Sequence, residues 1–218
     1  MRHVSRILVA LLAAGCATPT PPPSFDDPLP ALVEPPVKAQ VVDPNRSIDA
    51  LKDAIRRLKA GELAQADADL AEIVRVRPDL AEAHLNLGWS RLQRRRPAES
   101  IEHLKEGLRL KPAAIGAHNL LGLAFRESGR FAEAEQAYLD GLKAGPNHDR
   151  MHLNLGILYD LYLGETRKAL THYRRYQALQ KTPDPKVAGW IVVIERALGP
   201  AAADDAPAST PAATGGRQ

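Results

Sequence analysis

The pentapeptide HLNLG occurs at His84–Gly88 and again at His152–Gly156, and the near-copy HNLLG lies midway between them at His118–Gly122. The three copies therefore begin at one constant step along the chain. Three prolines follow the same step, at Pro78, Pro112 and Pro146. Self-similarity at a fixed period of about 34 residues is the sequence signature of an architecture in which small units stack one on the next.

The residues of one period predict a pair of helices. In the stretch AHNLLGLAFRES, the apolar residues Leu121, Ala124 and Phe125 recur at helical spacing. Gly129 follows this stretch and can adopt the left-handed conformation that ends a helix. A second helix, AEAEQAYLDGLKA, is then stopped by Pro146.

The first of these helices contains an interior glycine, Gly122. Glycine inside a helix costs about 1 kcal/mol relative to alanine. This cost is understandable where a neighbouring helix has to approach closely at the same level. The second helix offers Ala134 as a small contact, followed by Tyr138 and Leu142.

This repeat period, with Leu-Gly in the first helix and Pro at the end, resembles the tetratricopeptide repeat (TPR) family. The resemblance implies an all-α TPR solenoid over residues 47–198, with units 47–80, 81–114, 115–148 and 149–182. The following segment 185–198 places apolar residues on one helical face and is expected to cap the stack: Val187, Trp190, Ile191, Ile194 and Leu198.

The four units depart from the pattern at identifiable places. The first has Asp53-Ala54 in place of Leu-Gly. The second has Arg95 in place of the turn glycine, and Pro97 then suits the first turn of a helix. The fourth has one extra residue before Gly164.

The first sixteen residues, MRHVSRILVALLAAGC, have the basic head, short apolar run and small-residue end of a secretory signal peptide. Cys16 is the only cysteine in the sequence and comes directly after Gly15. This arrangement resembles the lipobox of bacterial lipoproteins, which implies that residues 1–15 are removed and that Cys16 is lipidated. Ala13 stands where that family usually has Leu, and an ordinary signal peptide with an incidental cysteine is the alternative.

The segments on either side of the repeats differ from them in composition. Residues 16–46 are rich in proline, which disfavours helix and central strand, and are expected to be a semi-stiff linker. Residues 199–218 have almost no large apolar side chains and are expected to be disordered.

The lipobox resemblance implies attachment to a membrane by lipid alone. Ala17, by analogy with Gram-negative lipoproteins, favours the outer membrane, with the folded part facing the periplasm. The chain has 29 Lys and Arg, and loss of Arg2 and Arg6 leaves 27 against 26 acidic residues. This balance gives no reason to expect nucleic acid as a partner.

The residues suggest neither a metal nor a cofactor site. His84, His118 and His152 lie at equivalent positions of stacked helices, about 8–10 Å apart, whereas Zn–N bonds are about 2.0–2.1 Å long. A structural role is therefore expected for them. Because the sequence contains no nucleophile elbow and no phosphate-binding loop, we expect no enzymatic activity.

In TPR proteins the first helix of each unit lines a concave groove. The resemblance carries this role to partner-binding positions in the second to fourth units: Leu85, Trp89, Leu92, Asn119, Leu123, Arg126, Leu153 and Ile157. The matching residues of the first unit are Ile48, Leu51, Ile55 and Leu58, and here packing within the core is an equal alternative. An apolar groove containing Trp suits an amphipathic helix or an extended apolar peptide.

The turn of the second unit carries four arginines, Arg91, Arg94, Arg95 and Arg96. This basic patch could contact lipid headgroups or an acidic partner. The alternative is an ordinary solvated turn.

These interpretations together predict a non-enzymatic, membrane-anchored TPR scaffold that binds envelope proteins or peptides. Lipoproteins of this kind include pilotins, which serve type IV pilus and secretin assembly, and components of gliding-motility machines. An adaptor that regulates a peptidoglycan hydrolase or synthase is the second hypothesis.

Overall fold

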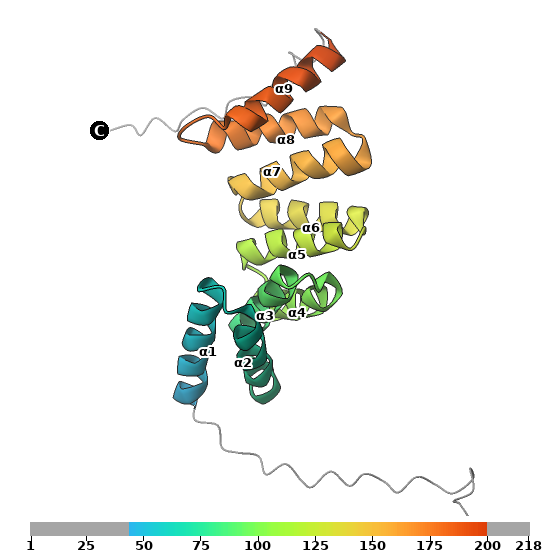
Figure 1. Cartoon of the computed structure of the whole chain (residues 1–218). Helices are drawn as coiled ribbons and strands as arrows, with labels where there is room; N and C mark the ends of the chain where they lie inside the picture. Colours follow the sequence, from blue (N-terminus) through green and yellow to red (C-terminus); the bar gives the residue numbers. More distant parts are fainter. Residues whose placement is uncertain (1–43, 200–218) are drawn as a thin grey trace, which may run out of the picture. The chain divides into compact units, whose positions relative to one another are not determined.

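The computed structural model describes residues 44–199, and this part of the chain is all-helical (Figure 1). The all-α solenoid predicted from the sequence is confirmed. Its elements are α1 (Pro44–Lys59), α2 (Leu63–Val76), α3 (Ala81–Gln93), α4 (Pro97–Leu110), α5 (Ile115–Glu127), α6 (Phe131–Ala144), α7 (Asp149–Leu158), the π-helical turn η1 (Tyr159–Leu163), α8 (Thr166–Leu179) and α9 (Pro185–Leu198).

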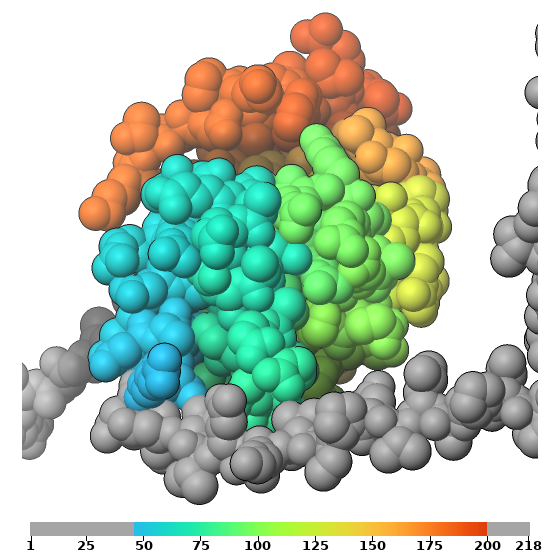
Figure 2. Space-filling view, turned by 60° about the horizontal axis from the view of Figure 1, so that its bottom comes forward, coloured from blue at the N-terminus to red at the C-terminus, as the bar shows by residue number. Residues whose placement is uncertain are grey.

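The helices form four consecutive pairs, α1–α2, α3–α4, α5–α6 and α7–α8, and each pair packs on the next. The first helices of successive pairs also contact one another, α1 with α3, α3 with α5 and α5 with α7, whereas the second helices have no contacts of this extent among the described residues. The first helices are therefore closer together and lie on the inner side of the curved stack. We call their combined surface the inner helix face. Figure 2 shows the α1–α2 end toward the viewer, with α8 and α9 behind it.

The last helix, α9, covers the end of the stack. Val187 and Ile194 are buried, and Trp190, Ile191 and Leu198 are partly buried against the same core. The expected capping role of segment 185–198 is confirmed. On its outer side α9 exposes Val192 and Val193.

The interior glycines lie where a large side chain of the paired helix crosses closely. A Cβ atom built on Gly122 would come within 2.6 Å of Cδ1 and Cζ of Tyr138, a fully buried residue of α6. Gly156 has the same relation to Tyr173, and Gly88 to Leu104. The close approach expected at Gly122 is thus observed.

Three of the four turns within the pairs contain a glycine with positive φ: Gly61 (82°), Gly129 (73°) and Gly164 (69°). In the α3–α4 turn this place is taken by Arg95, whose φ is 59°. This conformation is unfavourable for residues with a side chain, so the α3–α4 turn is locally strained.

The extra residue of the fourth unit is accommodated in η1. The turn widens to a π-helix between Tyr159 and Leu163, before Gly164 ends it. Because a π-helical turn closes its hydrogen bonds one residue further along the chain than an α-helical turn, it takes up one additional residue. It leaves Leu161 and Tyr162 69% and 46% exposed.

Several predictions fall on other parts of the chain. The signal peptide 1–15, the lipidation site Cys16, the linker up to residue 43 and the tail from residue 200 lie outside the described residues. Pro44, predicted to belong to the linker, instead begins α1. None of the helices in the described part is long and apolar enough to cross a membrane.

Candidate functional site on the inner helix face

A row of apolar side chains crosses the inner helix face. Ile55, Trp89, Leu123 and Ile157 lie at equivalent positions, one repeat period apart, on α1, α3, α5 and α7, and each is half-buried. We call these four residues the apolar row. Every unit thus presents one large apolar side chain that is neither fully packed nor fully solvated.

The other predicted groove residues divide into surface and core. Leu85 and Leu153 are half-buried, and the Leu85 side chain packs toward Gly107 of α4. Leu92 is only 8% exposed and belongs to the hydrophobic core. It contacts the interior of the stack, so its assignment to the binding surface has to be corrected.

In the first unit the core alternative holds for two residues. Leu51 and Leu58 are buried in the cluster formed by α1, α2 and α3. Ile55 is partly buried at the edge of this cluster, and Ile48 is exposed. The first helix is amphipathic, with its apolar stripe turned mainly toward α2 and α3.

Two amides cross-link neighbouring helices at this face. Asn154 Nδ2 of α7 donates a hydrogen bond of 2.8 Å to Oδ1 of Asn119 on α5. Asn119 is buried and engaged with Asn154, so its assignment to the binding surface has to be corrected like that of Leu92: its amide is a contact between units. Sequence reasoning missed Asn154 as its partner, because the two residues are not at equivalent positions of their units.

Arg126 is half-buried at the C-terminal end of α5, and its Nη1 atom is buried without a hydrogen-bond acceptor among the described residues. The Tyr138 hydroxyl is also buried without a partner there. Burial raises the pKa of Tyr138, and the positive charge of Arg126 partly opposes this rise. The guanidinium and the phenol are therefore close enough to interact electrostatically, but the guanidinium has only donors, so it gives the Tyr138 hydroxyl no acceptor.

The next unit has a carboxylate at the corresponding place. Asp160 lies one repeat period after Arg126, and its Oδ2 accepts a hydrogen bond of 3.3 Å from the Tyr173 hydroxyl. The inner helix face therefore carries a cation on the third unit and an anion on the fourth.

The predicted basic patch is largely engaged within the protein. Asp67 of α2 is buried and lies 3.5 Å from Arg91 Nε, 3.0 Å from Arg94 Nη1 and 3.9 Å from Arg96 Nη1. Glu99 pairs with both Arg91 and Arg96. Arg95 differs: it is 84% exposed and lies 3.6 Å from Glu127. Three of the four arginines hold the first unit to the second.

The repeated histidines have a structural role. His84, His118 and His152 each donate from Nε2 to the carbonyl of the proline six residues earlier, at 3.1, 3.3 and 3.0 Å. These bonds tie each first helix to the loop before it. Within residues 44–199, no group of three or more His, Cys, Asp or Glu side chains is placed to hold a metal ion.

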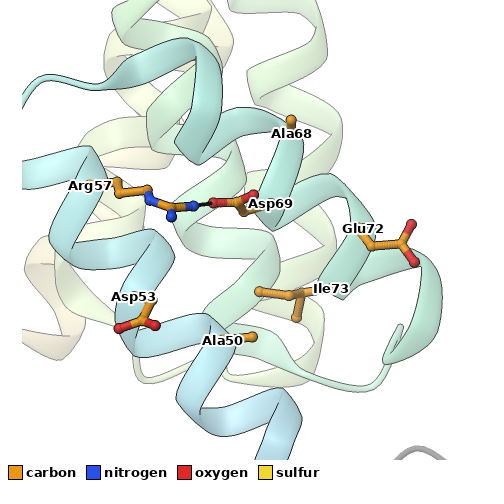
Figure 3. Close-up of a pocket in the computed structure, with 7 residues that line it drawn as sticks. All are labelled: Ala50, Asp53, Arg57, Ala68, Asp69, Glu72 and Ile73. Atoms are coloured by element: carbon orange, nitrogen blue, oxygen red, sulfur yellow. Dashed lines mark hydrogen bonds and ion pairs between the residues drawn. The ribbon is translucent and has the colours of Figure 1, made fainter.

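A shallow depression of about 360 Å³ lies between α1 and α2 (Figure 3). Arg57 of α1 reaches across it to Asp69 of α2, and the Ile73 side chain points toward α1. The remaining residues that line it are Ala50, Asp53, Ala68 and Glu72. Its charges are paired or solvated, and it brings together no nucleophile and base.

The tetratricopeptide repeat family model TPR_16 matches residues 51–115 and 119–184, which together are more than half of the chain. The chain belongs to the tetratricopeptide repeat family. Repeats of this family are scaffolds for protein–protein interaction, so this TPR chain is a protein-binding module at the level of its fold. A search among curated proteins found no match.

Solved structures with the same fold include several bacterial TPR proteins. MamA from Desulfovibrio magneticus RS-1 is 19% identical with a TM-score of 0.59, and the match covers 64% of this chain and 80% of that one. TTC0263 from Thermus thermophilus is 21% identical with a TM-score of 0.56, covering 70% and 83%. PilF from Pseudomonas aeruginosa is 21% identical with a TM-score of 0.61, covering 69% and 68%. At these identities the likeness establishes the fold alone.

Proposed function

We propose that this TPR chain is a non-enzymatic scaffold, held by lipid at the periplasmic face of the outer membrane, that binds a protein component of an envelope machine. The machine would be a type IV pilus with its secretin or a gliding-motility apparatus. The proposal combines the sequence pattern around Cys16 with the surface of the inner helix face.

The observation that carries the binding function is the apolar row. Ile55, Trp89, Leu123 and Ile157 are half-buried at equivalent positions of four successive units. Apolar surface that a fold leaves partly exposed in a continuous row marks an interaction site, and Trp is frequent among residues that dominate binding energy. A row of this kind fits the apolar side of a helix or of an extended peptide.

The anchoring function rests on the first sixteen residues and on the proline-rich segment after them. Lipid chains contribute about 0.8 kcal/mol per buried CH₂, and more than one chain gives stable attachment. A proline-rich linker advances about 3.1 Å per residue, which would hold the folded repeats away from the lipid surface.

The binding function is tested by photo-crosslinking in cells from position 89. A photoreactive aromatic amino acid replaces Trp89, so that an aromatic ring is kept there, and a matched control places the same amino acid at Glu102, an exposed residue on the outer helix α4. We expect position 89, and not position 102, to capture an envelope-assembly protein. A secretin or a motility component would identify the machine, whereas a peptidoglycan hydrolase or synthase would favour the adaptor hypothesis. Equal capture from both positions, or none from position 89 in a folded protein, would contradict the proposal.

The anchor is tested separately with Cys16→Ala. We expect this change to abolish metabolic labelling with a fatty acid and to release the protein from the membrane fraction. Labelling that persists in the variant would rule out Cys16 as the lipidation site.

A further inference from the structure

Arg126 is half-buried and has no carboxylate at ion-pair distance within residues 44–199, and its buried Nη1 has no hydrogen-bond acceptor there. Arg175, which is also half-buried without a carboxylate, donates instead to Oδ1 of Asn147. Arg57 pairs with Asp69, and Arg91 pairs with Asp67 and Glu99. Removing a charged group partly from water is costly unless it is paired. The guanidinium of Arg126 on the inner helix face therefore lacks the carboxylate partner that would offset this cost.

The fourth unit shows how the same arrangement looks when it is complete. Tyr173 packs over Gly156, and its hydroxyl donates to Asp160, which lies four residues after Gly156 in the sequence. In the third unit Tyr138 packs over Gly122 in the same way, and the residue four positions after Gly122 is Arg126. Both the phenol and the guanidinium Nη1 then lack an acceptor among the described residues. The acceptor that the fourth unit supplies itself is missing from the third.

Nη1 and the Tyr138 hydroxyl are buried, so a docked segment would reach Arg126 through the part of its half-buried side chain that faces solvent. The surroundings of Arg126 define what kind of group could pair with it there. Leu123, of the apolar row, lies one helical turn before Arg126 on α5 and is half-buried. Ile157 is the next residue of the row, on α7. Asp160 carries a negative charge one unit further along, which disfavours a second anion there. These features match one acidic group within an otherwise apolar segment.

We propose that the inner helix face binds a protein segment whose apolar side chains lie on the apolar row and whose single Asp or Glu side chain pairs with Arg126. This inference rests on the proposed binding function and assigns the partner's chemistry. An Arg–carboxylate pair adds direction to an apolar contact, because its planar donors fit the two carboxylate oxygens. The position of the acid would fix the register of the segment along the four units.

The experiment selects binders from a library of random twelve-residue peptides displayed without a free terminal carboxylate. The full chain is the target, in parallel with Arg126→Gln and Trp89→Ala. We expect the wild-type chain to enrich apolar peptides with one acidic residue, and Arg126→Gln to lose the acidic preference. A selected peptide, resynthesised, should bind Arg126→Gln at least about tenfold more weakly, and replacing its Asp or Glu by Asn or Gln should have the same effect on the wild-type chain.

The controls separate this inference from the proposed function. Arg126→Lys keeps the charge and should retain the acidic preference, and urea unfolding checks that each variant is folded. Peptides without an acidic preference, or with the same preference on Arg126→Gln, overturn the role of Arg126. The binding function still stands in that case if Trp89→Ala abolishes their binding. Binding that is indifferent to Trp89→Ala, or the absence of any enriched peptide, overturns both.

Discussion

The Nδ1 atoms of His152 and His172 lie 3.0 Å apart, in a contact that links α7 to α8. Because the Pro146 carbonyl can only accept, His152 Nε2 must donate to it, which leaves His152 Nδ1 as the acceptor of a hydrogen bond from His172. Burial lowers the pKa of His152 and of His172, so both rings are neutral at pH 7. His84 and His103 repeat the arrangement on α3 and α4 at 3.4 Å, whereas His118 faces no second histidine because the equivalent residue is Ala137.

The histidine pair predicts a loss of stability in mild acid. Burial lowers the pKa of His172 to about 4, and the charges of His152 and Lys168 act in the same direction. The unfolded chain keeps a histidine pKa of about 6.5, so between pH 6.5 and 4 it binds more protons than the folded chain. We expect the free energy of unfolding to fall as the pH falls through this window, by on the order of 2 kcal/mol for this residue.

The measurement is urea unfolding at several values between pH 7 and pH 4, with His172→Gln as the matched variant. Glutamine keeps a donor near His152 but does not titrate. We expect its unfolding free energy to depend less steeply on pH than that of the wild type. Parallel pH profiles would mean that His172 makes no contribution in this range.

The turn at Arg95 predicts a stabilising substitution. Arg95 has a φ of 59°, a value that glycine adopts without steric cost, and glycine occupies this place in the other three turns. Arg95→Gly should raise the free energy of unfolding by about 0.5–1 kcal/mol, since the exposed ion pair with Glu127 contributes little. The reverse change in the next turn, Gly129→Ala, should lower it by about 1 kcal/mol. Chemical unfolding of the two variants decides this, and a destabilised Arg95→Gly would show that the side-chain contacts outweigh the strain.

The buried carboxylate of Asp67 predicts a large loss on truncation. Asp67→Ala would leave Arg94 without its carboxylate and would leave the half-buried Arg91 with Glu99 alone. We expect a loss of about 3 kcal/mol, because removing one partner of a buried pair leaves the other charge uncompensated. Asp49, which pairs with Lys52 at the surface, is the control, and Asp49→Ala should change the unfolding free energy by less than about 0.5 kcal/mol. Equal effects of the two substitutions in urea unfolding would refute the structural role of Asp67.

The repeat period was sufficient to predict the helix pairs, the capping helix and the turn glycines, because each depends on residues close together in the sequence. Gly129 and Pro146 end their helices through local backbone preferences that need no tertiary context. The close approach at Gly122 was also foreseeable, since an interior glycine needs a compensating contact.

The candidate site could be predicted only in part, because burial at equivalent positions differs from unit to unit. Leu92 and Arg126 occupy the same place in successive units, yet Leu92 is in the core and Arg126 remains at the surface. The ion pairs of Asp67 join residues more than twenty positions apart, and no sequence pattern predicts them. That Arg126 lacks an acceptor among the described residues is a property of the three-dimensional arrangement, so only the structure reveals it.

The packing around the interior glycines predicts that a Gly→Ala substitution lowers the free energy of unfolding by different amounts in the second and third units. A Cβ on Gly122 would meet the rigid, fully buried ring of Tyr138, whereas a Cβ on Gly88 would come within 2.6 Å of Cγ of the flexible Leu104. The first unit already has alanine at this place, Ala54, with Leu70 on the paired helix. Because alanine gains about 1 kcal/mol of helix propensity and Leu104 can adjust more easily than an aromatic ring, Gly88→Ala should destabilise the protein less than Gly122→Ala, which should lose about 1–2 kcal/mol net.

Urea unfolding of both variants measures this difference, and a double-mutant cycle with Tyr138→Leu locates its cause. If the ring is responsible, Gly122→Ala should cost less in the Tyr138→Leu background than in the wild type, by about 1 kcal/mol or more. Equal costs of Gly88→Ala and Gly122→Ala, or strict additivity with Tyr138→Leu, would show instead that the glycines are required for a reason other than the residue that crosses them.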